Sequence, residues 1–189
     1  MPIDSALTKY GAFSPGVCTS TTRPTSPYQG QSIYESDTGS FLVYYGATTG
    51  WKPPWNQPWG VITNISSLSN TITAGNVAGL SYTLNAVANR LYQITITVKT
   101  SWSATGRLIL TLSDGGATVQ RIADYSTAVS SDQAAITGVV SRSFTAGAHS
   151  LAVAFSVISG TVVLGTTASN THELTITDIG PSTSTAPTS

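Results

Sequence analysis

Apolar and polar side chains alternate through much of the chain, and this period of two predicts β-strands. In residues 90–100, apolar side chains at positions 92, 94, 96 and 98 alternate with polar ones, so one face of the strand is expected to be buried. Gly, Asn and Ser interrupt the pattern about every ten residues, as in antiparallel sandwiches and barrels. We predict strands near residues 60–63, 70–73, 80–84, 90–100, 106–113, 117–123, 134–144, 147–156, 161–165 and 172–179. No segment predicts a helix of more than about two turns.

One of these strands has two apolar faces. Large side chains at positions 151, 153, 155 and 157 alternate with Ala152, Ala154 and Ser156. A face this small and uncharged can lie close against a second copy of the chain, so the three small residues are candidates for a subunit interface. The alternative is that the strand is central in its sheet and is covered by a loop.

A β-hairpin is predicted near the start of the patterned region. Residues 31–35 and 40–45 are rich in Ile, Tyr, Phe and Val, and a four-residue loop that ends in Gly39 separates them. Residues 21–30 precede the hairpin and contain Arg23-Pro24, Ser26-Pro27 and Gln29-Gly30, which favour turns and extended backbone over helix.

In the first 22 residues the apolar side chains follow neither the helical period of 3.6 nor the strand period of two, and Gly11 and Pro15 would interrupt a helix. We therefore predict an extended arm. Its aromatic residues Tyr10 and Phe13 are expected to pack on the body of the chain or on another protein; a frayed terminus without function is the alternative. No long apolar run follows a basic segment, so we expect neither a secretory signal nor a membrane anchor. We expect the protein to be synthesised in the cytosol. Residues 181–189 hold no aliphatic larger than alanine and predict a flexible tail.

Three of the four tryptophans, Trp51, Trp55 and Trp59, fall within nine positions of a proline-rich segment. Interleaved Pro and Trp give a stiff segment whose flat rings can stack on sugars or on another chain. The other interpretation is that these rings, with Tyr34 and Tyr44, form the small core of the hairpin module. Both interpretations, module packing and ligand stacking, stay open at this point.

Low charge narrows the function classes. Charged residues make up 8% of the 189 residues, and eight acidic side chains balance eight basic ones. Without net repulsion, such a surface offers little resistance to association, so we expect an assembled protein. The basic residues are single and scattered, which argues against nucleic acid as a partner. The lone Cys18 excludes an internal disulfide and, without neighbouring His or Cys, a structural zinc site; we expect it to be a small buried side chain.

Candidate catalytic groups are few and do not cluster. We interpret His149 and His172 as surface turn residues, and Asp114 as a turn former. Glu35 and Asp37 border the hairpin loop and could together hold a cation, although simple solvation is the alternative. The sequence contains no Gly-x-Ser-x-Gly motif and no phosphate-binding loop. Asp124, Asp132 and Asp178 are separated in sequence and by predicted turns, so they do not have the spacing of metal ligands. We therefore predict a protein that is not an enzyme and uses neither cofactor nor metal.

Residues 20–46 resemble a short module that recurs in tailed-bacteriophage virion proteins, of the form TRPxxPxxGQxIYExDTxxxxVYxG followed by a tryptophan. Residues 74–181 are similar in style to β-sandwich domains of minor tail, head-fibre and decoration proteins of phages that infect Gram-positive or actinobacterial hosts; LSYTLNAVANRLYQITITVKT and LTITDIGP carry this likeness. The positions that match the module are Thr22, Arg23, Pro24, Pro27, Gly30, Gln31, Ile33, Tyr34, Glu35, Asp37, Thr38, Val43, Tyr44 or Tyr45, Gly46 and Trp51.

The resemblance implies a structural protein on the virion surface, made in the host cytoplasm. It implies an all-β fold with an extended docking arm over residues 1–22, a hairpin adaptor over 23–62, a jelly-roll-like antiparallel sandwich over 63–180 that forms a homotrimer, and a tail over 181–189. Tyr10, Phe13 and Val17 would then dock to a major capsid protein or a tail protein. No membrane partner is implied. The alternative is a carbohydrate-binding module that uses Trp51, Trp55, Trp59 and Trp102 on a host surface glycan.

Overall fold

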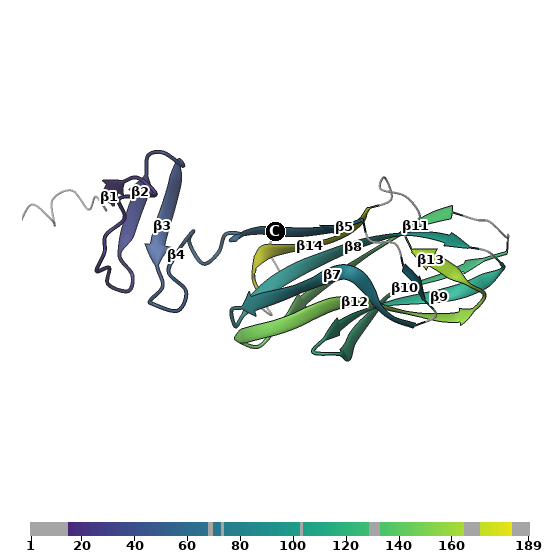
Figure 1. The fold of residues 1–189 in the computed structure, drawn as a ribbon. Helices are drawn as coiled ribbons and strands as arrows, with labels where there is room; N and C mark the ends of the chain where they lie inside the picture. The colour runs from purple at the N-terminus through teal and green to yellow at the C-terminus, as the bar shows by residue number, and fades with distance from the viewer. Residues whose placement is uncertain are drawn as a thin grey trace, which may run out of the picture. The chain divides into compact units, whose positions relative to one another are not determined.

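The computed structural model describes residues 15–67, 70–72, 74–102, 104–128, 133–164 and 171–182, and these form strands, turns and loops without a helix (Figure 1). The predicted all-β class is therefore confirmed. The chain divides into two compact units, one up to Gln57 and one from Pro58 onward, which are described separately.

The N-terminal unit is a four-stranded sheet in sequence order. Strand β1 runs parallel to β2, and the remaining pairs are antiparallel. The predicted hairpin is present as β2 and β3, and Gly39 in its loop has a φ of 65°, a backbone conformation that glycine adopts without strain. The strands are β1 Gly16–Cys18, β2 Ser32–Glu35, β3 Ser40–Tyr44 and β4 Trp51–Lys52.

The larger unit contains a strand at each of the ten predicted places, most of them longer than predicted because the apolar alternation continues past the turn residues. They are β5 Gly60–Ser66, β6 Asn70–Ile72, β7 Ala74–Ala86, β8 Arg90–Trp102, β9 Gly106–Asp114, β10 Ala117–Thr127, β11 Gln133–Ser143, β12 Gly147–Ser159, β13 Val162–Leu164 and β14 His172–Pro181. Strand β5 pairs along β14, so residues 60–62, which the sequence suggested for the hairpin module, belong to the larger unit.

These strands form two antiparallel sheets. One has the order β10-β9-β12-β7; the other has the order β5-β14-β8, with β11 on the far edge of β8 and β13 and β6 continuing from the β14 side (Figure 1). Side chains from both sheets share one buried core, so the larger unit is a β-sandwich.

The sequence pattern decides which face is buried. Strand β8 alternates strictly between buried and partly exposed positions along its 13 residues, and Ile94, Ile96 and Val98 are fully covered. In the other sheet, strand β9 contributes Leu108, Leu110 and Leu112 to the same core, and these three side chains have no exposed surface. Each fully buried aliphatic side chain contributes roughly 1.5–3 kcal/mol, so this shared core is the main stabilising feature of the sandwich.

Glycine is required at position 106, where β9 begins. A Cβ added there would lie 2.2 Å from the backbone oxygen of Ser159 and 2.8 Å from the ring of Trp102. We expect Gly106→Ala to lower the free energy of unfolding of the larger unit by about 1–3 kcal/mol, because neither neighbour can move without disturbing the core. Thermal unfolding of the purified variant checks this. Gly16→Ala is the control, since its Cβ would meet only a methyl group of Ile33 at an ordinary 3.9 Å and should cost little.

Candidate docking surface of the N-terminal unit

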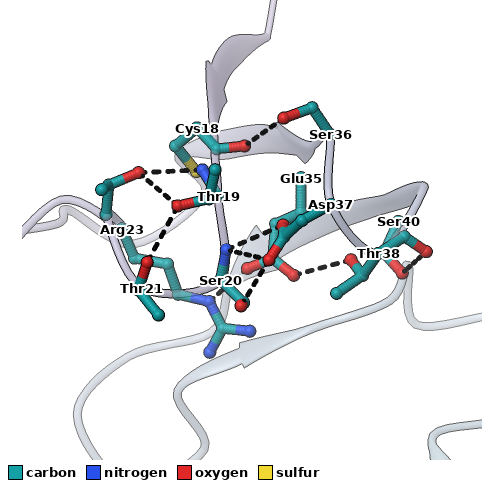
Figure 2. A network of polar contacts seen from close by, with 11 residues as sticks. Cys18, Thr19, Ser20, Thr21, Arg23, Glu35, Ser36, Asp37, Thr38 and Ser40 are labelled. Atoms are coloured by element: carbon teal, nitrogen blue, oxygen red, sulfur yellow. Dashed lines mark hydrogen bonds and ion pairs between the residues drawn. The ribbon is translucent and has the colours of Figure 1, made fainter.

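A polar network fastens the chain after β1 to the end of the β2–β3 hairpin (Figure 2). The Nε of Arg23 donates to the Oε1 of Glu35, and the hydroxyl of Thr38 donates to the other carboxylate oxygen of Glu35 at 2.9 Å. The Glu35 side chain is 2% exposed, whereas that of Arg23 is 39% exposed. A nearly buried carboxylate is thus paired with a cation that keeps contact with water, which offsets the cost of burying its charge.

Asp37 makes a second fastening in the same loop. Its two carboxylate oxygens accept hydrogen bonds from the backbone N–H of Ser20, at 2.9 and 3.1 Å, and from the Ser20 hydroxyl at 2.6 Å. The N–H of Ser36 donates to the backbone oxygen of Cys18 at 3.0 Å and so continues the pairing between β1 and β2. Asp37 therefore stabilises the turn after β1, because its carboxylate accepts a backbone N–H that would otherwise need water as its partner.

Both carboxylates are poised to stay ionised. The hydrogen bond from Arg23 lowers the pKa of Glu35, and the hydrogen bond from the Ser20 hydroxyl lowers the pKa of Asp37. The lone pairs of these acids are thus directed to protein donors. Among the described residues, no group of three or more His, Cys, Asp or Glu side chains is arranged to hold a metal ion, and a cation site at this loop stays without structural support.

These pKa directions predict an acid-sensitive unit. A carboxyl group with a lower pKa in the folded state stabilises that state at pH values above its unfolded pKa, about 3.9 for Asp and 4.3 for Glu. The stabilisation is lost as pH falls through the folded pKa. We expect the Ser20 amide resonance in an NMR titration to stay constant from pH 7 to about 5 and to move below about 4. Asp37→Asn should abolish this acid-induced movement at Ser20, and an unchanged titration in that variant would contradict the assignment.

On the other face of the sheet, three apolar side chains form a row across three strands. Val17 of β1 pairs with Tyr34 of β2, and Tyr34 pairs with Phe41 of β3. Their exposed fractions are 72%, 41% and 36%. The neighbouring residues Ile33 and Leu42 point the opposite way and are buried. The sheet therefore has one covered face and one face that presents an apolar row, which we call the exposed row.

The exposed row was only partly foreseen from the sequence. Val17 is exposed, as docking would require, while Tyr10 and Phe13 lie outside the described residues. Tyr34 was expected either to pack within the module or to stack on a ligand, and Phe41 was not singled out. The signal was the alternation in β2: Ile33 and Glu35 share one face, which leaves Tyr34 on the other.

Tyr44 and Tyr45 each pack against a tryptophan in the described part of the N-terminal unit. Tyr44 and Trp51 pack with ring centroids 5.3 Å apart, and Tyr45 and Trp55 with centroids 6.0 Å apart. Both tryptophans are half-buried, so each ring packs on a tyrosine and keeps part of its surface in contact with water.

The other two tryptophans belong to the larger unit. Trp59 lies over the guanidinium of Arg90, 4.0 Å from the ring centroid. Trp102 is 1% exposed, and its Nε1 donates to the hydroxyl of Thr100 at 3.2 Å. Trp102 therefore offers no ring face for a sugar, and Trp59 does not share a unit with Trp51 and Trp55.

The candidate interface on β12 lies in the middle of a sheet, between β9 and β7. Ala152 is 8% exposed, Ala154 is half-buried and Ser156 is exposed. Hydroxyls of the adjacent strand lie close to the two alanines, because Ser113 donates to the backbone oxygen of Ala152 at 3.1 Å and Thr111 to that of Ala154 at 3.3 Å. The strand is central in its sheet, which is one part of the alternative interpretation, whereas Ser156 is exposed and is not covered by a loop.

The two histidines differ from their expected surface positions. His172 is fully buried: it shares the face of β14 that carries Leu174 and Ile176, and its Nδ1 accepts the N–H of Lys99 at 3.2 Å. The surface interpretation of His172 is therefore wrong. His149 is partly buried, with its Nδ1 2.6 Å from a carboxylate oxygen of Asp114, which raises the pKa of the imidazole. Asp114 thus serves as the partner of His149 in addition to ending β9.

Comparisons with known proteins leave the family open. No family model matches the chain, and no curated protein matches it. Among solved structures, dimeric latent PorU from Porphyromonas gingivalis aligns with a TM-score of 0.38 and 12% identity over 65% of this chain and 13% of that chain. Eiger TNF from S. frugiperda aligns with a TM-score of 0.38 and 8% identity over 69% of this chain and 98% of that one. No helix among the described residues is long and apolar enough to span a membrane.

Proposed function

We propose that this chain is a non-catalytic structural protein on the exterior of a phage virion. Its N-terminal region docks to the major capsid protein or to a tail protein, and its β-sandwich projects as a homotrimer. The protein would act as a capsid decoration or head-fibre protein, or as a minor tail protein, without cofactor. The resemblance of residues 20–46 to a virion module and the absence of net charge support this proposal.

The observation that carries the docking role is the exposed row of Val17, Tyr34 and Phe41. Large apolar side chains on the surface of a small sheet cost solubility unless a partner covers them. The polar network on the loop end keeps this sheet in one conformation, since Arg23, Ser20 and Thr38 tie the turn after β1 to the hairpin. A preorganised surface of this kind loses little entropy when it binds.

The connectivity of the larger unit supports the jelly-roll part of the proposal. Strands β7, β9 and β12 lie in one sheet and β5, β8, β11 and β14 in the other, so that consecutive long strands alternate between sheets at β7–β8–β9 and β11–β12. This alternation is typical of two Greek keys wound into a jelly roll. The carbohydrate-binding alternative has less support, because the tryptophan rings pack on Tyr44, Tyr45 and Arg90.

Particle incorporation tests the docking role. The triple variant Val17→Ser, Tyr34→Ser, Phe41→Ser should be at least tenfold depleted from purified particles while it keeps the fold of the larger unit. Tyr28→Ser is the matched control, because Tyr28 is 71% exposed in the same unit but lies outside the row. Normal incorporation of the triple variant would overturn the docking surface. A chain that lacks residues 1–14 tests the preceding segment in the same assay, because this deletion keeps β1, Val17 and the contact between Ser20 and Asp37.

A further inference from the structure

The outer face of the β5-β14-β8-β11 sheet collects exposed aliphatic side chains. Among the described residues of the larger unit, five large aliphatic side chains are exposed, and those of β5 and β11 lie on this face. Val61 and Ile65, each 62% exposed, belong to β5 at one edge, and Val139, 55% exposed, belongs to β11 at the other. The strand register places them on the same face of this sheet.

Between these aliphatics the face is filled with threonine. Residues opposite one another in paired strands point to the same side, so the register defines the rows. One row reads Thr63, Thr175, Thr95 and Val139; the next reads Ile65, Glu173, Thr97 and Thr137. Strands β8 and β11 pair over 11 residues without a register shift, which keeps this part of the face regular.

Four of the threonine hydroxyls on this face bond to one another in pairs. Thr63 and Thr175 share a hydrogen bond of 3.4 Å, and Thr97 and Thr137 share one of 3.1 Å. A hydroxyl that bonds to a neighbour loses less when water is removed than a hydroxyl that depends on water. Their methyl groups then add to the apolar surface. Covering this face is therefore less costly than its polar composition suggests.

Charge on this face is balanced within a small area. Glu173 on β14 pairs with Thr97, and Lys99 lies two residues beyond Thr97 on the same face of β8. The outer face of the other sheet instead carries Asp124 with two arginines, Arg107 at 2.8 Å and Arg121 at 3.4 Å. A face with one acid and one base is complementary to itself, because a second copy can set Lys99 against Glu173 in both directions.

We propose that this sheet face is where copies of the chain meet, with Val61, Ile65 and Val139 as its apolar contacts and Lys99 and Glu173 as its charge pair. The contact is twofold and joins copies in pairs, so the inference goes beyond the proposed homotrimer, whose contacts must be heterologous. It uses this sheet face and not the face of β12 that carries Ala154 and Ser156. Four strands about 4.8 Å apart and rows about 6.7 Å apart give a footprint of roughly 20 Å by 20 Å. This flat area of about 400 Å² is about half of the 800 Å² per partner that a standard interface buries, so the face fits a weak contact between copies.

A charge exchange on the full-length protein tests the proposal. Lys99→Glu leaves two acids on the face, and Glu173→Lys leaves two bases, so each variant alone should raise the concentration for half-assembly at least tenfold in analytical ultracentrifugation. An equimolar mixture of the two variants should recover assembly. Unchanged assembly of both single variants, or failure of the mixture to assemble after each variant has dissociated, would overturn the proposal.

Two further variants separate the candidate faces. Val139→Lys should dissociate the oligomer, while Ser156→Lys on β12 should leave it intact; the reverse result would place the interface on β12. A wild-type chain that stays monomeric at 100 times the concentration in the assay would also overturn the inference. Incorporation of the exposed-row variants into particles is measured independently, so a failed interface and a failed docking role give different results. Circular dichroism verifies that each variant is folded.

Discussion

Arg23→Ala is expected to unfold the N-terminal unit while the larger unit remains folded. The substitution removes the cation that pairs with Glu35, whose side chain is 2% exposed. Loss of one partner of a buried ion pair costs about 3–5 kcal/mol, and the exposure of Arg23 places this case near the lower end. A four-stranded sheet with one covered face has little stability to lose.

Hydrogen exchange read by mass spectrometry measures this effect for each unit. Peptides from β1 to β3 should lose protection in Arg23→Ala, whereas peptides from β8 should exchange as in the wild-type protein. Glu35→Gln is the matched control, because it removes the buried charge, keeps the side-chain shape and leaves Arg23 in contact with water. Its cost should be only about 1 kcal/mol. Equal protection of β1–β3 in Arg23→Ala and in the wild type would show that the ion pair is not needed.

The unfolding of this unit has a functional consequence under the docking proposal. Val17, Tyr34 and Phe41 belong to three strands, so their alignment depends on the pairing that the polar network maintains. Arg23→Ala should therefore reduce particle incorporation as much as substitution of the row itself. The network and the row are separate features of the sequence with one shared role.

The sequence was sufficient to predict the strands because their signal is local. In β8, the alternation of Ile94, Ile96 and Val98 with polar residues fixes which face is buried, and the structure confirms it. Sheet partners are a different matter. Strand β8 pairs with β11, with β14 and at its end with β13, and nothing in the residues around position 90 indicates these distant partners.

Buried polar residues were the main failure of prediction, since their partners are remote in sequence. His172 was interpreted as a surface residue from its neighbours, although its period of two with Leu174 and Ile176 placed it on the buried face. Arg90 has no exposed surface. Its charge is paired with the carboxylate of Asp178, which lies 88 positions away in the sequence, so the residues around Arg90 give no sign of this partner. Glu35 was likewise interpreted as an acid at the hairpin loop, whereas in the structure it accepts a hydrogen bond from Arg23 and is nearly buried. A composition rule that assigns charged residues to the surface misses such pairs.

Asp178→Ala is expected to give the largest loss of stability in the larger unit. The Nε of Arg90 donates to one carboxylate oxygen of Asp178 at 2.9 Å, and Nη2 donates to the other at 2.5 Å. Asp178 also accepts the N–H of Gly180 at 2.9 Å, and Trp59 covers the guanidinium. The substitution therefore takes the carboxylate away from a fully buried cation. We expect a cost of about 3–5 kcal/mol, or a fall in melting temperature of roughly 10–20 °C for a domain of this size.

A double variant distinguishes the charge from the packing. Combining Asp178→Leu with Arg90→Met replaces the pair by apolar side chains of similar volume, and such replacements are often neutral or stabilising. The double variant should therefore melt above Asp178→Ala by several degrees, because no buried cation remains. Trp59→Ala, which removes only the ring over Arg90, should cost about 1–2 kcal/mol. If Asp178→Ala melts within about 1 °C of the wild type, less than 1 kcal/mol depends on the pair, and the closure between β8 and β14 must then depend on the backbone ladder and the apolar core alone.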